Sequence, residues 1–147
     1  MAKDKLRVRV ATPDKVKYDR DADMVIMRCI TGDMGILPKH EACSVILDYG
    51  VLRIMNEGDE KRMAVFGGIA QVRDNMVTVL ANDAQWPEDI DLSVAEAERD
   101  RVTRVMKENA QGLELQKEQI QMRRTLVQIE VSSYPLVGRA AHATGKK

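Results

Sequence analysis

The spacing of apolar residues changes abruptly along this chain. From Leu6 to about Ala81, apolar and polar residues alternate, as in the run Leu6-Arg7-Val8-Arg9-Val10. After Trp86-Pro87-Glu88, the chain is rich in alanine, charged residues and glutamine, and its apolar residues recur at helical spacing. A strand turns every second side chain to one face, whereas a helix returns to the same face every 3.6 residues. Any fold must therefore join a strand-rich region to a helical one.

Short apolar runs fill the strand-rich region, and most are bounded by Gly, Pro, Asp or Asn. Short strands at this spacing predict an antiparallel β-sandwich or a flattened barrel. Residues 56–60 and 73–75 predict hairpin turns, because Gly, Asp and Asn tolerate the backbone angles of a tight reversal. After the first strand, the predicted strands lie at 24–30, 44–47, 50–55, 63–66, 69–72 and 76–80.

The helical region predicts a two-helix hairpin. Asp91 and Ser93 are both candidates for the N-cap of the first helix, and Glu96 stands at capping-box spacing from Ser93. This helix is expected to run to about Ala110. Gln111-Gly112 then predicts the interruption, because glycine accepts the left-handed conformation that ends helices.

The second helix carries apolar residues on two opposite faces. A helix that packs only on its hairpin neighbour needs one such stripe. The other stripe predicts a contact with the strand domain, with another subunit, or with each at different times, and a helix enclosed within its own monomer explains the pattern equally well. One stripe is Leu113, Ile120 and Val127, and the other is Leu115, Met122 and Ile129.

Composition argues against several classes of protein. Lysine and arginine together number 23, as do aspartate and glutamate, so no net field attracts nucleic acid or acidic lipid. Cys29 and Cys43 are too few for a disulfide framework or a four-cysteine zinc site, which favours a reducing, cytosol-facing compartment. The N-terminus alternates charged and apolar residues and predicts neither a signal peptide nor a membrane span.

No catalytic or metal site emerges from the residues. His40 and Cys43 are close in sequence, but no third residue completes a nucleophilic site. His40 and His142 are about a hundred residues apart, and the acidic residues show no calcium-loop order, so no metal is predicted. Gly67-Gly68 lacks the flanking residues of a phosphate-binding loop.

Three segments carry a family resemblance. Residues 32–40 match the motif G-[ED]-x-G-I-x-P-x-H, residues 66–72 contain GGI-x-x-V, and residues 75–84 match N-x-V-T-V-L-A-[DE]-x-A. In this order, and followed by a charged helical hairpin, they resemble the epsilon subunit family of F-type ATP synthase. The resemblance covers roughly residues 5 to 131.

The resemblance implies a β-sandwich of about ten strands in residues 1–86 and a regulatory antiparallel two-helix hairpin in residues 87–131. Composition predicts a flexible tail in residues 132–147. The resemblance also implies a non-catalytic rotor subunit in the central stalk of a proton-translocating ATP synthase. Its sandwich would rest on the gamma subunit and the c-subunit ring, peripheral to the cytoplasmic face of a bacterial cell membrane.

The first motif is implied to be a docking loop for gamma and the c ring. Its residues in this chain are Gly32, Asp33, Gly35 and His40, with Asp33 at the acidic position that faces the polar loops of the ring. Such a contact selects partner and register electrostatically. Ala42 stands where the family usually has proline.

Members of the family hold the hairpin either folded on the sandwich or extended into the catalytic alpha/beta hexamer, where it blocks ATP hydrolysis. Two apolar stripes suit a helix that must bury apolar surface in both arrangements. Lys117, Arg123 and Arg124 are expected to face an acidic segment of a catalytic beta subunit in the extended form. The alternative is that they are solvated surface charges.

Some relatives bind ATP on the folded hairpin through the motif [IL]-D-x-x-R-A. Ile90, Asp91 and Ala95 match it, but Val94 replaces the arginine. Losing that guanidinium removes a contact of about 1.5–3 kcal/mol, so ATP binding is expected to be weak or absent. No other cofactor is predicted.

Two rival functions remain open at this stage. A free-standing adaptor with a sandwich and a helical hairpin would not co-purify with a gamma subunit. An enzyme of unknown type would depend on His40 and Cys43.

Overall fold

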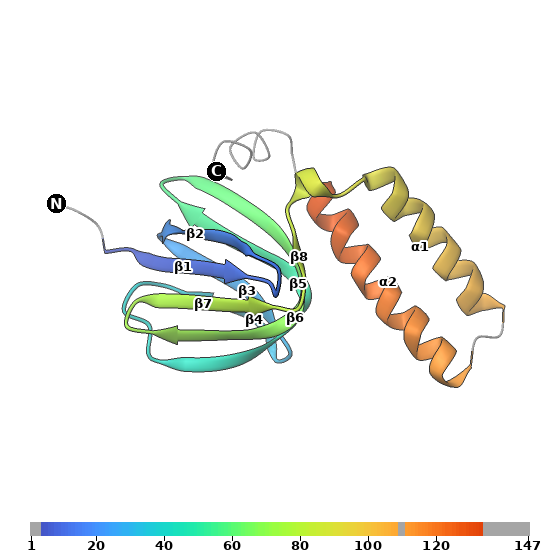
Figure 1. Cartoon of the computed structure of the whole chain (residues 1–147), viewed down its shortest axis with the longest axis horizontal. Coiled ribbons are helices and arrows are strands. Elements are labelled where there is room, and N and C mark those ends of the chain that lie inside the picture. The colour runs from blue at the N-terminus through green and yellow to red at the C-terminus, as the bar shows by residue number, and fades with distance from the viewer. Residues whose placement is uncertain (1–3, 109–110, 134–147) are drawn as a thin grey trace.

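The computed structural model describes residues 4–108 and 111–133. A strand-rich domain comes first and a helical hairpin projects from it (Figure 1). The strands are β1 (Leu6–Ala11), β2 (Val16–Ala22), β3 (Met24–Cys29), β4 (Gly32–Ile36), β5 (Cys43–Asn56), β6 (Asp59–Arg73), β7 (Met76–Ala81) and β8 (Ala84–Gln85). A 3-10 turn, η1 (Pro87–Asp89), leads to α1 (Leu92–Lys107) and α2 (Gly112–Ser132).

One sheet forms the whole strand domain. Its order is β2-β1-β7-β6-β5-β3-β4, and β8 pairs with β6. The pair β1–β7 is parallel and the other pairs are antiparallel, so the predicted antiparallel sandwich contains one parallel pair. The two edges of the sheet are β2 and β4.

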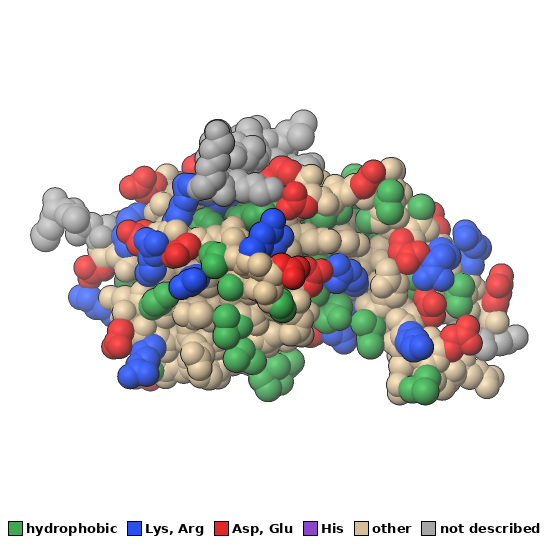
Figure 2. Space-filling view, viewed as in Figure 1, with side chains coloured by type: hydrophobic (Ala, Val, Ile, Leu, Met, Phe, Trp, Pro, Cys, Tyr) green, Lys and Arg blue, Asp and Glu red, His purple; other side chains and the backbone are tan. Residues whose placement is uncertain are grey.

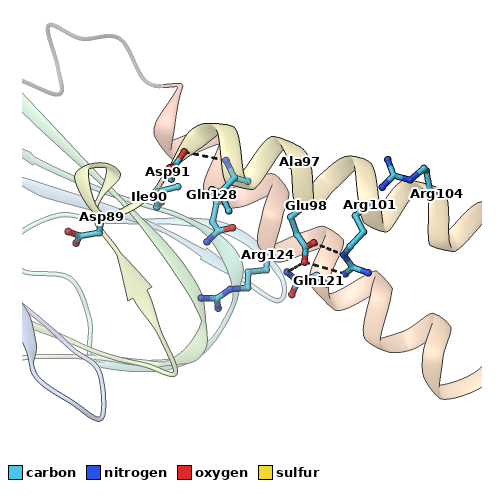
Figure 3. Close-up of a pocket in the computed structure, with 12 residues that line it drawn as sticks. Asp89, Ile90, Asp91, Ala97, Glu98, Arg101, Arg104, Gln121, Arg124 and Gln128 are labelled. Atoms are coloured by element: carbon cyan, nitrogen blue, oxygen red, sulfur yellow. Dashed lines mark hydrogen bonds and ion pairs between the residues drawn. The ribbon is translucent and has the colours of Figure 1, made fainter.

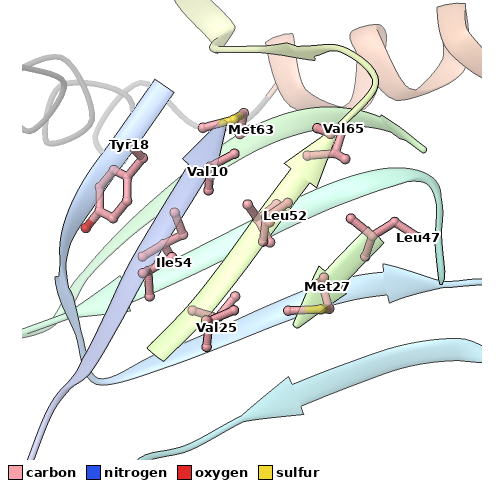
Figure 4. Close-up of a cluster of buried hydrophobic side chains, with 14 of the residues drawn as sticks. Val10, Tyr18, Val25, Met27, Leu47, Leu52, Ile54, Met63 and Val65 are labelled. Atoms are coloured by element: carbon pink, nitrogen blue, oxygen red, sulfur yellow. The ribbon is translucent and has the colours of Figure 1, made fainter. Parts of the chain in front are cut away.

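The sheet curls so that one face encloses the core (Figure 4). The alternating residues Leu6, Val8 and Val10 are fully buried, as their spacing predicts. Trp86, directly after β8, is buried in the same cluster and lies near Tyr18 of β2, with ring centroids 6.2 Å apart. Burying each large apolar side chain contributes about 1.5–3 kcal/mol, so this inner face is the main source of stability.

Eight strands form in the described residues, fewer than the predicted ten. The resemblance implies the figure of ten, whereas β5 and β6 each join two of the predicted runs into one long strand and β2, β4 and β8 form outside those runs. The β5–β6 ladder keeps its register across the junction, where Gly67 and Gly68 have φ of 79° and 131°. Glycine allows the strand to bend there without ending.

Both predicted hairpin turns are confirmed. Glu57 and Gly58 have positive φ between β5 and β6, and Asp74 and Asn75 have positive φ between β6 and β7. Gly58, Asp74 and Asn75 are residue types that tolerate the left-handed region of the backbone map, whereas Glu57 adopts it as part of the tight turn.

Asp91 is the N-cap of α1. Its side chain accepts hydrogen bonds from the backbone N–H groups of Ser93 and Val94, and the Ser93 hydroxyl donates to it at 2.7 Å. Ser93 therefore lies inside the helix and forms no capping box with Glu96. The helix ends at Lys107, and Gln111 is the N-cap of α2, so Gln111-Gly112 begins the second helix.

Only the C-terminal half of α2 packs on the sandwich. Val127 and Val131 pack against Ala64 and Phe66 of β6, on the outer face of the sheet. The rest of the hairpin, α1 included, projects away from the strands (Figure 1). None of the helices in the described part of the chain is long and apolar enough to span a membrane. The predicted tail begins inside α2, and residues 134–147 lie outside the described residues.

Candidate functional site

The first motif is a strand over most of its length. Gly32–Ile36 forms the edge strand β4, which pairs with β3 across the Ile30-Thr31 turn. The prediction of a loop is therefore wrong for these residues. Asp33 is exposed and lies opposite Arg28, with 3.3 Å between its Oδ1 and Arg28 Nη1. Gly35 lies opposite Ile26. Asp33 and Gly35 thus stand on a free edge of the sheet.

His40 lies at the other end of this segment. The backbone N–H of Lys39 donates to the side chain of Asn75 in the β6–β7 turn, and Lys39 Nζ is 3.1 Å from Asp4. His40 Nδ1 donates to the carbonyl oxygen of Glu41 at 2.7 Å. A strand rises about 3.4 Å per residue, so β4 alone separates Asp33 from the start of this turn by about 10 Å. The structure therefore does not bring Asp33 and His40 together.

Cys29 and Cys43 belong to the core side of the sandwich. Cys29 is buried, which raises the pKa of its thiol, and Cys43 packs against the core from its margin. In the described part of the chain, His40 and Cys43 share no hydrogen bond. Within residues 4–108 and 111–133, no cluster of His, Cys, Asp or Glu has the geometry of a metal site.

A row of exposed apolar side chains crosses the outer face of the sheet. We call it the apolar row: Ile30, Ile46, Ile69 and Leu80, each between 45% and 61% exposed. Ile46 pairs with Ile69 and Ile69 with Leu80, while the Ile30 N–H donates to the Ile46 carbonyl at 3.1 Å. Apolar side chains also gather on the sandwich face seen in Figure 2. Sequence reasoning missed this row, because register sets which residues of β5, β6 and β7 lie side by side and which of them lies beside the β3–β4 turn.

Two consecutive arginines join α2 to the sandwich. Arg123 Nη2 is 2.7 Å from Asp48 Oδ1 in β5, and its guanidinium lies over the Tyr49 ring at 4.8 Å. Arg124 Nη2 is 2.7 Å from Asp83 Oδ2 between β7 and β8, and its guanidinium lies 4.0 Å over Phe66. In this arrangement both arginines are paired with carboxylates of the sandwich, while 55% of the Arg123 side chain and 29% of the Arg124 side chain stay exposed.

The two stripes of α2 have different surroundings. Val127 is buried against the sandwich, but Ile120 and Leu113 continue the same stripe beyond it and are 50% and 76% exposed. Lys117, on this projecting half, is also exposed. The residues of the other stripe, Leu115, Met122 and Ile129, are half-buried.

A pocket of about 650 Å³ lies between the two helices and η1 (Figure 3). The residues of the degenerate ATP motif, Ile90, Asp91, Val94 and Ala95, all line it. The Asp91 carboxylate is engaged as the helix cap, and the hydrogen bond from Ser93 lowers its pKa.

The guanidiniums of this pocket are mostly engaged as well. Arg101 pairs with Glu98 at 2.6 Å and with Glu118 at 3.3 Å, and Arg124 pairs with Asp83. Arg104 is the lining arginine that has no ion pair within the described ranges. The motif residues therefore meet at one pocket, but Val94 supplies no charge there.

The sandwich matches a known family. The family model described as ATP synthase, Delta/Epsilon chain, beta-sandwich domain matches residues 5–87, more than half of the chain. This chain belongs to the ATP synthase epsilon-chain family. The family resemblance carried by the three motifs is thus confirmed.

Curated relatives extend the match into the helices. The ATP synthase epsilon chain of Brevibacillus brevis is 43% identical over 105 residues, which are 71% of this chain and 80% of that protein. The chloroplastic epsilon chain of Emiliania huxleyi is 34% identical over 125 residues, 85% of this chain and 96% of that one. The predicted identity as an ATP synthase epsilon subunit is confirmed.

Solved structures share the fold. A chain in the mitochondrial ATP synthase of Euglena gracilis has a TM-score of 0.77 at 20% identity, over 88% of this chain and 82% of that chain. A chain in the central stalk and c-ring of the Tetrahymena thermophila enzyme has a TM-score of 0.57 at 19% identity, over 90% of this chain and 100% of that chain. The predicted β-sandwich with a C-terminal two-helix hairpin is confirmed.

Proposed function

We propose that this epsilon subunit makes and breaks no bonds of its own and acts as a rotor element. It joins gamma to the c ring at the cytoplasmic face of a bacterial cell membrane, and it restrains ATP hydrolysis through α1 and α2. Two surface features of the described residues support a docking function: the apolar row and the exposed Asp33 carboxylate on the edge strand β4, which pairs with Arg28. Lys117, Arg123 and Arg124 would meet the catalytic hexamer when the hairpin extends and the two arginines leave the sandwich.

The apolar row carries this proposal. Isolated exposed apolar residues are ordinary on a protein surface, but three in register across neighbouring strands, with Ile30 of the adjoining turn beside them, mark an interaction site. We assign the row to gamma, because a permanent rotor contact is expected to bury apolar surface. Asp33, on the free edge of β4, is assigned to the polar loops of the c ring, where charge selects partner and register.

The test is co-purification of gamma with the variant Ile69→Gln/Leu80→Gln. Fully burying an exposed large apolar side chain contributes about 1.5–3 kcal/mol, and Ile69 and Leu80 are 45% and 46% exposed. The double variant is therefore expected to weaken gamma binding about ten- to a hundred-fold. Val16→Gln is the matched control, because Val16 is 44% exposed and Ile69 45%. Gamma that binds the double variant as tightly as the parent chain would refute this assignment, and a parent chain that never retains gamma would favour a free-standing adaptor.

ATP is proposed to be a poor ligand of the interhelical pocket. Val94 stands where the motif needs a guanidinium, and Arg101 and Arg124 are already paired with carboxylates. Among the described lining residues, a bound triphosphate could pair with Arg104 alone, and it would have to displace existing ion pairs to gain a second guanidinium.

A further inference from the structure

The hairpin rests on the sandwich through a small apolar contact with an ion pair on either side. Val127 and Val131 are the buried apolar residues that α2 contributes to this contact. Arg123 reaches β5 and Arg124 reaches the turn between β7 and β8, so the two pairs lie on different elements of the sandwich. Because this apolar contact is small, even ion pairs that contribute less than a buried valine can shift the balance between attached and released hairpin.

Both carboxylates are held in place by their own backbone. Asp48 Oδ1 accepts from the backbone N–H of Tyr49 at 2.8 Å as well as from Arg123. Asp83 Oδ1 accepts from the backbone N–H of Ala84 at 2.9 Å, which leaves Oδ2 for Arg124. The acids are thus oriented before the arginines arrive, which lowers the entropy lost when the pairs form.

Aromatic rings complete each arginine site. Tyr49 lies under Arg123 and Phe66 under Arg124, and the two rings contact each other edge to face, with centroids 5.6 Å apart. A guanidinium over an aromatic face is attracted to it while it keeps its hydrogen bonds. Each arginine therefore binds one carboxylate and one ring of the sandwich.

We propose that Asp48 and Asp83 form an ionic latch that holds the hairpin on the sandwich and competes with catalytic subunits for Arg123 and Arg124. The attachment to the sandwich stands independently of the proposed function. The competition rests on the proposed function, in which the same arginines contact catalytic subunits when the hairpin extends. A guanidinium paired with Asp48 or Asp83 is not available to an acidic segment of a partner. Loss of the latch therefore releases the helix and frees its cations in one step.

The latch is weak enough to be reversible. Side-chain exposures of 55% and 34% for Arg123 and Asp48, and of 29% and 45% for Arg124 and Asp83, leave both pairs open to solvent ions. Pairs of this kind change an equilibrium by about two- to five-fold each and are screened by salt. The latch thus predicts that the fraction of chains whose hairpin packs on the sandwich falls as ionic strength rises.

Distance measurements on the full chain test the latch. Spin labels at Glu57→Cys and Gln119→Cys, in a chain with Cys29→Val and Cys43→Ala, report the separation of hairpin and sandwich by pulsed electron resonance. Asp48→Asn and Asp83→Asn each keep the side-chain shape and remove the charge. Each is expected to lower the ratio of seated to released hairpin about two- to five-fold, and the double variant about ten-fold.

Salt gives the signature of an ionic contact. Raising NaCl from about 0.02 M to about 0.5 M shortens the Debye length several-fold and is expected to release the hairpin in the parent chain, but to change little in the double variant. Asp74→Asn is the control, because Asp74 is an exposed turn residue at positive φ, which asparagine tolerates. A double variant with the parent's distance distribution and salt response would overturn the latch.

Hydrolysis by the assembled complex tests the competition separately. Asp48→Asn/Asp83→Asn is expected to slow ATP hydrolysis, and removal of residues 91–147 to speed it. Unchanged or faster hydrolysis in a double variant whose hairpin is released would overturn the competition. Unchanged hydrolysis after truncation would contradict the proposed inhibitory function, while the distance data would still decide whether the latch exists.

Discussion

At the scale of single residues, two glycines allow neighbouring strands of the sandwich to pack closely. Gly68 has a φ of 131°, and a Cβ there would collide with the carbonyl oxygen of Leu80 on the neighbouring strand. A Cβ at position 50 would lie 2.4 Å from the Cβ of Arg28, so this position admits glycine alone unless Arg28 moves. These are demands of packing between strands, which local sequence patterns do not reveal.

Gly68→Ala is expected to destabilise the chain by more than about 2 kcal/mol, since the backbone of β7 must move to admit the methyl group. Urea denaturation measures the change. Gly58→Asn is the control, because nothing lies within 4 Å of a Cβ at Gly58 and asparagine tolerates its positive φ. If Gly68→Ala lowers the free energy of unfolding by less than about 1 kcal/mol, and by a value within about 0.5 kcal/mol of the control, the β6–β7 pairing can adjust to the methyl group and the prediction is wrong.

The contribution of Glu60 to the stability of the fold is expected to depend on pH. Hydrogen bonds from Arg53, and then from Arg62, hold its pKa at about 2, below the ordinary 4.5. Its folded state therefore binds fewer protons than the unfolded chain, so its contribution to stability is complete above about pH 4.5 and is lost as pH falls toward 2. Allowing for solvent screening, Glu60→Gln is expected to cost on the order of 2 kcal/mol at pH 7 and almost nothing near pH 2. Urea titrations at both pH values measure this, and an equal cost at both would assign the effect to shape, not charge.

At the scale of elements, the sequence predicts best where one local pattern decides the outcome. The alternation in β1, both hairpin turns and the two helices follow from neighbours in the chain. The pairing of β5 with β6 through a bend and the strand form of residues 32–36 depend on partners far along the chain. Sequence reasoning missed Asp48 and Asp83 for the same reason, because only the packing of α2 on the sandwich brings an arginine to each of them.

The hairpin predicts a gain of ligand binding from one substitution. Val94 is exposed and lines the interhelical pocket with Asp91 and Ala95, so Val94→Arg is expected to restore the missing charge. One charge-assisted contact is worth about ten- to a hundred-fold in affinity for ATP. Calorimetry on the full chain compares Val94→Arg with Val94→Gln, which adds length without charge. Tight ATP binding by the parent chain, or equal binding by both variants, would contradict this account of the pocket.

At the scale of the whole molecule, a stable sandwich carries a lightly attached hairpin. The core is enclosed by strands alone, with Trp86 at its end, and α2 touches the outer face of the sheet. Movement of the hairpin therefore leaves the core intact. Such a division suits a subunit that keeps one set of partners while its helices change theirs.

Because the core lies within the sandwich, we predict that the sandwich folds without the two helices. A chain ending at Ile90 is expected to keep a cooperative thermal transition, because removing α2 uncovers one small apolar cluster and leaves the main one untouched. Circular dichroism and calorimetry measure this. A truncated chain that unfolds without a cooperative transition would show that the helices are part of the fold's main stability.

The central claim is that this chain works through its docking surfaces and divides coupling from restraint between its two parts. The most direct measurement is ATP-driven proton pumping, together with ATP hydrolysis, in membrane vesicles whose ATP synthase lacks this subunit and is then supplied with either the full chain or residues 1–90. Both chains are expected to restore pumping for each ATP hydrolysed, and the full chain alone is expected to slow hydrolysis. If neither chain changes pumping, the claim is contradicted.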